Sequence, residues 1–138
     1  MPARDLYHDE IRSALEADGW TITHDPYVIP VGLGRVFVDL GAERLLAASR
    51  GTERIAVEVK SFLGRSAIAD LEQALGQYLL YRPLLSRHEP DRTLFLAVPL
   101  STHEEAFGST AGQIAVETYE IRLMVVDTDN RRIERWRR

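Results

Sequence analysis

The first stretch of the chain, residues 5–20, has apolar side chains at the spacing of an α-helix. They are Tyr7, Ile11, Ala14 and Leu15. Gly19 follows them, and glycine commonly ends a helix because it adopts the backbone conformation needed there at little cost. Residues 21–29 then alternate between apolar and polar side chains, which predicts a strand.

Two more strand-like runs follow, at residues 34–50 and 53–62, and a turn around residues 50–53 separates them. Together with the run at 21–29, they predict an antiparallel meander. All three precede the longest helical pattern in the chain.

The second half of the chain alternates between helical and strand-like patterns. Residues 67–82 predict a helix that Ser66 caps and Pro83 ends. The later predicted elements are a buried strand at 92–100, a helical region at 102–120 broken near Gly108, a buried strand at 121–128 and a short edge strand at 131–136. The order α-β-β-β-α-β-α-β predicts an α/β (α+β) fold with a mixed β-sheet flanked by helices on both faces.

Length and composition narrow the classes of protein. A chain of 138 residues is typical of one domain, here residues 1–138. The absence of cysteine excludes disulfides and cysteine zinc sites, and the four histidines show no metal-ligand spacing. No apolar run reaches the roughly 20 residues that cross a bilayer, so we expect a cytoplasmic protein without a membrane partner. The net charge of −4 argues against indiscriminate nucleic-acid binding, although residues 131–138 are strongly basic.

The strand-like stretch at 53–62 carries the first candidate chemistry. Its apolar residues alternate with Glu58 and Lys60, so both charged side chains share one face. A carboxylate and an ammonium group so placed can bind a divalent cation and position water beside a phosphate. A charged outer face of an ordinary strand is the alternative explanation.

A second carboxylate is needed for such a site, since hard divalent cations favour several oxygen ligands. Asp39 is the first candidate, because aspartate is uncommon inside apolar strands. A tight turn at 50–53 would instead set Asp39 opposite residue 64, unless a bulge corrected the register. Glu43 therefore stays the alternate ligand.

Further polar candidates lie on the two longest predicted helices. Glu10 borders the apolar stripe of the first helix and could lean inward as a third acid, although the helix dipole also favours an acid there. Gln73, Gln77 and Tyr81 follow one another at a spacing of four on the second helix. This polar side suits contact with a phosphate or with the lysine; a solvent-exposed helix face is the alternative.

These parts together resemble the PD-(D/E)XK nuclease superfamily. The tripeptide E-V-K at 58–60, Asp39 on the preceding strand and Q-Y-L-L-Y at 77–81 carry the resemblance. It implies a restriction-endonuclease-like core in which Asp39 and Glu58 bind Mg²⁺ (or Mn²⁺) and Lys60 helps to orient and activate water. Val38 stands where that superfamily commonly has proline.

A closer resemblance covers nearly the whole chain. The blocks ARDLYHDEIRSAL, GWTITHDP, DLGAERLLAA, IAVEVKSF and ALGQYLLYR occur in the order found in the XisH family, the fdxN-element excision controlling factors of cyanobacteria. This resemblance implies a role in programmed DNA excision, with DNA and a small XisI-type protein as partners.

Two functions are compatible with these expectations. The first is a Mg²⁺-dependent DNA endonuclease that hydrolyses a phosphodiester. The second is a non-catalytic DNA-binding or regulatory factor that acts with an XisI-type partner to control a recombinase; the negative net charge favours it, because a partner could supply basic surface. A homodimer is compatible with both.

Overall fold

The structure is a computed structural model that describes residues 4–46, 51–64 and 66–138. Its helices are α1 (His8–Ala17), α2 (Ala67–His88), α3 (Leu100–Thr102) and α4 (Thr110–Tyr119), with a π-helical segment at His103–Phe107 between the last two. Its strands are β1 (Thr21–His24), β2 (Tyr27–Pro30), β3 (Arg35–Val38), β4 (Leu40–Leu46), β5 (Gly51–Val59), β6 (Arg92–Pro99), β7 (Leu123–Asp127) and β8 (Arg132–Arg137).

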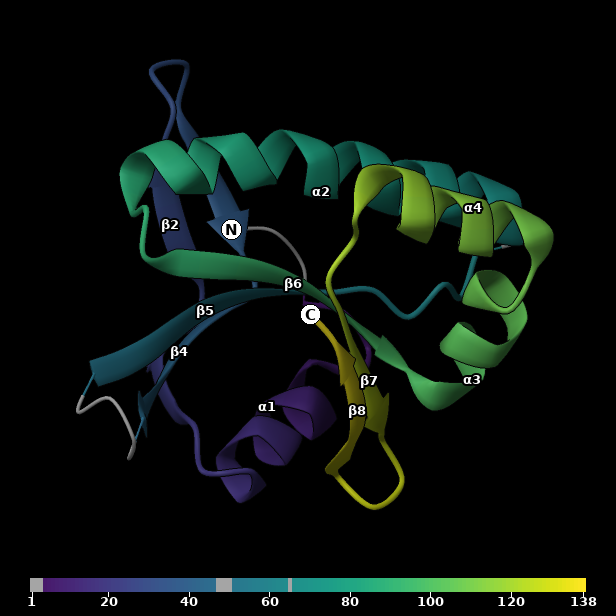
Figure 1. The fold of residues 1–138 in the computed structure, drawn as a ribbon, viewed down its shortest axis with the longest axis horizontal. Coiled ribbons are helices and arrows are strands. Elements are labelled where there is room, and N and C mark those ends of the chain that lie inside the picture. The colour runs from purple at the N-terminus through teal and green to yellow at the C-terminus, as the bar shows by residue number, and fades with distance from the viewer. Residues whose placement is uncertain (1–3, 47–50, 65) are drawn as a thin grey trace.

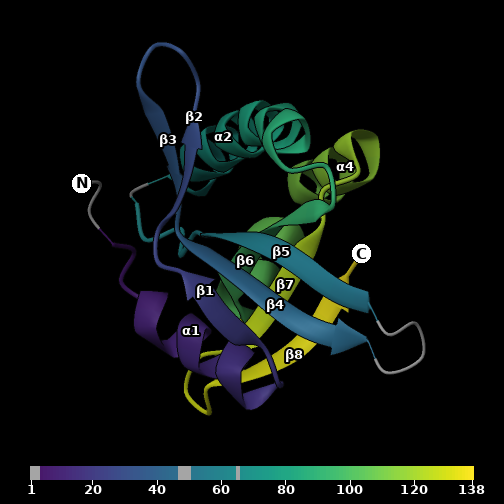
Figure 2. The same cartoon turned by 90° about the vertical axis from the view of Figure 1, so that its left-hand side faces the viewer.

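A six-stranded mixed sheet forms the centre of the molecule, with the strand order β1-β4-β5-β6-β7-β8. The three central strands β5, β6 and β7 run parallel, and the outer strands pair antiparallel with their neighbours. The strands β2 and β3 form a separate hairpin that projects beside α2 (Figure 2). The helices α2 and α4 cover one face of the sheet and α1 covers the other (Figure 1). The predicted mixed sheet with helices on both faces is therefore confirmed.

Each face of the sheet has its own apolar core. Along β5, Val57 and Val59 belong to the cluster beneath α1, whereas Ala56 belongs to the cluster beneath α2. Because side chains alternate along a strand, Glu58 faces the same side as Ala56, toward α2. The strand therefore presents Glu58 to the space between the sheet and its longest helix.

Three predicted boundaries are wrong. The run at 34–50 is divided at Asp39, which lies in a bend between β3 and β4. The run at 21–29 is likewise divided into β1 and β2. The turn expected at 50–53 is also misplaced, because residues 51–53 belong to β5; residues 47–50 lie outside the described residues.

The predicted end of the long helix at Pro83 is wrong as well. Helix α2 continues through Pro83 to His88. Proline removes one helical hydrogen bond, but Leu85 in the following turn is 1% exposed and packs in the core. The free energy gained by burying the last turns of α2 therefore exceeds the free energy lost with the hydrogen bond at Pro83. The N-cap is as predicted, since the Ser66 side chain accepts a hydrogen bond from the Ala69 N–H.

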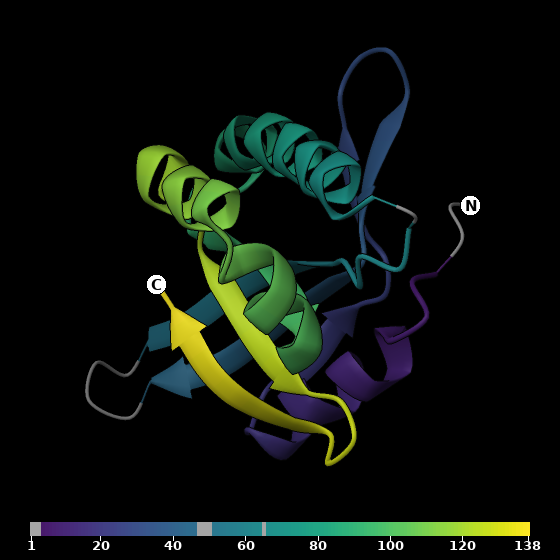
Figure 3. The ribbon, with the colours of Figure 1, turned by 90° about the vertical axis from the view of Figure 1, so that its right-hand side faces the viewer.

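The C-terminal part of the chain follows the prediction closely. Strand β6, the helical break near Gly108 and strand β7 lie where the pattern places them. The strand β8 is an edge strand of the sheet (Figure 3). Within the described ranges, no helix combines the length and apolar character that membrane crossing requires.

Tyr78 ties α2 to the sheet, and its removal is a test of this fold. Its buried hydroxyl donates to the Leu94 carbonyl at 3.2 Å and accepts from the Arg122 N–H at 3.1 Å. We expect Tyr78→Phe to lower the free energy of unfolding by about 1–3 kcal/mol, because both backbone groups lose a buried partner. Urea denaturation measures the change. Tyr119→Phe, at a residue that is 46% exposed, is the matched control and should change stability by less than about 0.5 kcal/mol.

Candidate active site

The register between β4 and β5 brings Asp39 to Glu58. Leu40 lies opposite Val57, and the pairing continues without a shift as far as Leu46 opposite Gly51. Asp39, one residue before Leu40, therefore lies at the end of β5. Its carboxylate accepts a hydrogen bond of 2.7 Å from the Val59 N–H. No bulge between β4 and β5 is needed to form this pair.

Of the acid pair, Asp39 and Glu58, the second is buried beneath α2 and the first is half-buried. Burial and the nearby charge of Asp39 raise the pKa of Glu58 to about 8. Burial also raises the pKa of Asp39, against the opposing effect of the hydrogen bond from Val59. Two carboxyl groups so close, one buried and one half-buried, cannot both ionise at low cost. At neutral pH and without a cation, the pair therefore retains a proton.

Glu58 has unused capacity to bind a ligand. Its side chain is 7% exposed, and its Oε1 atom has no hydrogen-bond partner among the described residues. Its Oε2 atom lies 3.7 Å from the Lys60 ammonium, which opposes the rise in the pKa of Glu58. A buried oxygen without a partner is costly, so this position is suited to a cation or an ordered water.

The chain that leaves β5 is anchored from two sides. The N–H and hydroxyl of Ser61 both donate to the Asp5 carboxylate, at 3.1 and 3.0 Å. The Thr102 hydroxyl donates to the Ser61 carbonyl at 2.7 Å. The Lys60 N–H donates to the Ala97 carbonyl at 3.0 Å. These bonds hold the backbone on both sides of the lysine in place.

The polar side of α2 contributes to the same region. Burial raises the pKa of Tyr81, and the charges of Glu58 and Asp39 raise it further, so its hydroxyl lies within their electrostatic reach. Gln73 lines a pocket of about 190 Å³ with Lys60. The buried Oε1 of Gln77 has no hydrogen-bond partner in the described part of the chain. The predicted stripe is therefore not a plain solvent-exposed face.

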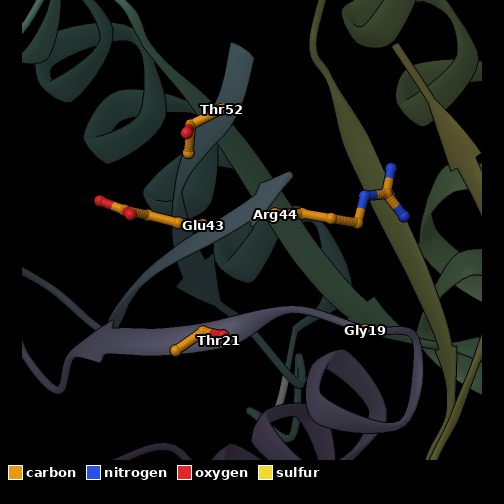
Figure 4. A pocket seen from close by; sticks show the side chains of 5 residues that line it. All are labelled: Gly19, Thr21, Glu43, Arg44 and Thr52. Carbon is orange, nitrogen blue, oxygen red and sulfur yellow. The ribbon is translucent and has the colours of Figure 1, made fainter. Parts of the chain in front are cut away.

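Glu43 does not join the acid pair. It lies four residues along the chain from Asp39, 3.3 Å from Arg54. With Thr21 and Thr52 it lines a different pocket, of about 370 Å³, and Figure 4 shows it pointing to the opposite side of β4 from Arg44. The register explains this separation, because it sets Glu43 opposite Arg54 rather than Lys60. Asp39 is therefore the carboxylate beside Glu58.

Glu10 does not lean toward the pair either. Its carboxylate lies 3.8 Å from Arg131, in the connection between β7 and β8. The expectation of a third acid from this position is wrong, because the helix turns Glu10 toward the strand at the far edge of the sheet. Helix α1 contributes a different residue instead.

His8 is the residue that the sequence analysis missed. It is 3% exposed, and its Nε2 atom lies 2.9 Å from Asp25, which also accepts a 2.6 Å hydrogen bond from Arg12. Its Nδ1 atom has no hydrogen-bond partner among the described residues. A positive charge on this ring lowers the pKa of Asp39. The available signal was its spacing, because residues 8, 11 and 15 share the buried face of α1.

The donors present fit a hard cation that keeps part of its own hydration. Two carboxylates, one with an unpartnered oxygen, are the ligand type that Mg²⁺ prefers. No cluster of three or more metal-binding side chains occurs within residues 4–46, 51–64 and 66–138. Mg²⁺ commonly binds through one or two carboxylates with water and substrate phosphates completing its shell. The site therefore suits Mg²⁺ or Mn²⁺ better than an ion that needs a complete protein cage.

The fold and the site define a class: mixed α/β proteins with two acids and a lysine at the end of a central parallel strand. Within that class, the chain belongs to the XisH family, whose model, described as XisH protein, matches residues 1–134. No curated protein sequence matches the chain significantly.

Two crystal structures are similar over nearly the full chain. One is an XisH family protein from Nostoc punctiforme, with 38% identity and a TM-score of 0.87, covering 97% of this chain and 100% of that one. The other is an fdxN element excision controlling factor protein from Anabaena variabilis, with 40% identity and a TM-score of 0.85, covering 96% and 98%. The expected family is therefore confirmed.

The proton held by the acid pair makes stability depend on pH. The pKa of Glu58 in the folded protein, about 8, lies above its ordinary value of 4.5. The stabilisation from protonation is therefore complete below pH 4.5 and is lost as the pH rises through 8. Glu58→Gln stays neutral throughout, so we expect it to become more stable than the unmodified protein as the pH rises. The difference between pH 5 and pH 9 should be on the order of 3 kcal/mol.

Urea denaturation in EDTA at pH 5, 7 and 9 measures this difference. Glu117→Gln, which removes an exposed carboxylate, is the control and should give a curve parallel to that of the unmodified protein. Parallel curves for Glu58→Gln would show that Glu58 is already ionised in the folded protein at pH 5.

Proposed function

We propose that this protein is a Mg²⁺-dependent DNA endonuclease, also active with Mn²⁺, that acts in the excision of a programmed DNA element. The observation that carries the proposal is the pair formed by the half-buried Asp39 and the buried Glu58, with the Lys60 ammonium 3.7 Å from Glu58. Together with the E-V-K tripeptide, the pair supports a PD-(D/E)XK nuclease-like core. The link to excision comes from the Anabaena variabilis relative, which is described as an fdxN element excision controlling factor.

In this proposal Asp39 and Glu58 hold the cation. Bound Mg²⁺ supplies a Lewis acid that stabilises charge on the phosphoryl oxygens and lowers the pKa of a bound water. The Lys60 ammonium, held by the anchored backbone around it, orients the attacking water beside Glu58. The hydroxyl of Tyr81 and the amide of Gln77 are placed on α2 to contact the phosphate or the lysine.

Hydrolysis needs no covalent enzyme intermediate in this scheme. The water oxygen forms the new bond to phosphorus, and the bond from phosphorus to one sugar oxygen breaks. That oxygen leaves with a proton from the water or from solvent. The role of the protein is to position the reactants and stabilise charge, which are the main contributions to phosphoryl transfer.

Cleavage of labelled DNA tests the proposal directly. We expect Glu58→Gln and Asp39→Asn each to lower the rate of Mg²⁺-dependent cleavage by at least about 100-fold, since each removes one of the two charged ligands. Glu43→Gln is the matched control, because Glu43 lies in the same sheet but outside the acid pair, and it should keep most of the activity. Equal cleavage by Glu58→Gln and the unmodified protein would overturn the proposal.

Thermal unfolding tests cation binding without any substrate. Mg²⁺ should raise the Tm of the unmodified protein in a concentration-dependent way, because a ligand that binds only the folded state stabilises it. Asp39→Asn should remove this dependence, and Glu43→Gln should leave it intact. A rise in Tm that is the same in all three proteins would place the cation elsewhere.

A second candidate is a non-catalytic factor that directs a separate recombinase together with a small XisI-type partner. The net charge of −4 favours it, because a partner could supply further basic surface for binding DNA. This candidate predicts DNA binding that requires the partner and no cleavage with Mg²⁺ or Mn²⁺. Co-purification with the partner followed by a nicking assay separates the two functions.

A further inference from the structure

A group of four arginines lines one pocket at the C-terminal edge of the sheet. The pocket has a volume of about 500 Å³, and its lining residues are Arg82, Glu120, Arg122, Arg137 and Arg138. Four positive charges against one negative charge stand out in a chain whose net charge is −4. We call this group the arginine pocket.

The arginine side chains are held mainly by neutral groups. Arg82 donates to the carbonyls of Tyr119 and Glu120, at 2.8 and 3.2 Å. Arg137 donates to the Ile121 carbonyl at 3.1 Å. A carbonyl fixes a guanidinium without neutralising its charge. Each guanidinium has five N–H donors, and within the described part of the chain only the Nη1 nitrogen of each donates to a protein group. These two groups are therefore pre-oriented cations with spare donors.

The other two arginines differ in the contacts that their side chains make with neighbouring residues. Arg138 forms a 2.6 Å ion pair with Glu53 and lies over the ring of Trp136. The side chain of Arg122 has no hydrogen-bond or ion-pair partner among the described residues. Among the described residues, no carboxylate pairs with Arg122 or Arg137, so their positive charges can attract a bound anion most strongly.

The sheet places the arginine pocket in line with the acid pair. Glu58 lies opposite Leu96, Leu96 opposite Leu123, and Leu123 opposite Arg137. Residues directly opposite one another share a face, so this row lies on the α2 side of the sheet. Three strand spacings separate the backbones at its two ends by roughly 14 Å.

We propose that the arginine pocket binds backbone phosphates of a nucleic acid, as a second contact separate from the acid pair. Guanidinium groups match phosphate oxygens in geometry and form paired, charge-assisted hydrogen bonds with them. The row between Glu58 and the arginine pocket is buried, since Leu96 and Leu123 are in the core beneath α2. A phosphate chain that reaches both places would therefore pass over the outer side of α2. Four guanidinium groups around one pocket, in a protein proposed to act on DNA, favour such a chain over an isolated small anion. This inference rests on the proposed action on DNA and specifies where the chain contacts DNA away from the reacting phosphate.

The test is DNA binding measured by fluorescence anisotropy in EDTA, where no metal-dependent cleavage occurs. Arg122→Gln combined with Arg137→Gln should weaken binding by about tenfold or more at 150 mM salt. The slope of log K against log salt should fall by about 1.8, because each lost phosphate contact with a duplex contributes about 0.9. The double variant Arg131→Gln, Arg132→Gln removes the same charge from the far end of β8 and should leave the slope nearly unchanged.

The remaining outcomes decide against the proposal. An equal loss in both double variants would show a general charge effect rather than a site. Unchanged DNA binding with lost affinity for pyrophosphate would assign the pocket to a free phosphate ligand. Unchanged DNA binding with lost capture of an acidic partner protein would assign it to that protein. Because the readout is binding without metal, its result is independent of whether Glu58→Gln abolishes cleavage.

Discussion

The pairing of β4 with β5 is the constraint on which the candidate site depends. With Leu40 opposite Val57, Asp39 reaches the end of β5 and accepts the Val59 N–H. A slip of one residue would turn every side chain of one strand to the other face. The apolar residues that pack under α1 would then face α2, and Glu58 would enter the α1 core. The two apolar clusters therefore maintain the site by penalising any other register.

Removing the two carboxyl groups of the acid pair from water costs free energy, and neighbouring groups partly offset this cost. Burial raises the pKa of both carboxyl groups, and Glu58 keeps an oxygen without a partner. The Val59 N–H, the Lys60 ammonium and the ring of His8 act in the opposite direction by favouring negative charge. Acids with such perturbed pKa values are typical of functional sites.

Helix α2 connects the two regions to which we assign function. Tyr81 lies within reach of the acid pair, and the next residue, Arg82, lines the arginine pocket. Tyr78 holds the helix to the sheet through the Leu94 carbonyl and the Arg122 N–H, so the same side chain also supports the backbone of an arginine in the pocket. A nucleic acid bound at both places would lie across an element that is fixed to the central strands.

The sequence by itself determined the element types, the mixed sheet and the family. Its alternation and helical spacing are local signals, and they also placed Glu58 and Lys60 on one face of a strand. Only the tertiary structure decided which acid lies beside Glu58. That choice depends on the register, which places apolar side chains of both β4 and β5 in the core beneath α1. Tertiary contacts also decided that α2 continues through Pro83 and that Glu10 lies beside Arg131. They likewise place His8 close enough to Asp39 for its charge to affect the pKa of that carboxyl group. Contacts between residues far apart in the chain set these positions; only the burial of His8 had a local signal, its spacing with Ile11 and Leu15 on α1.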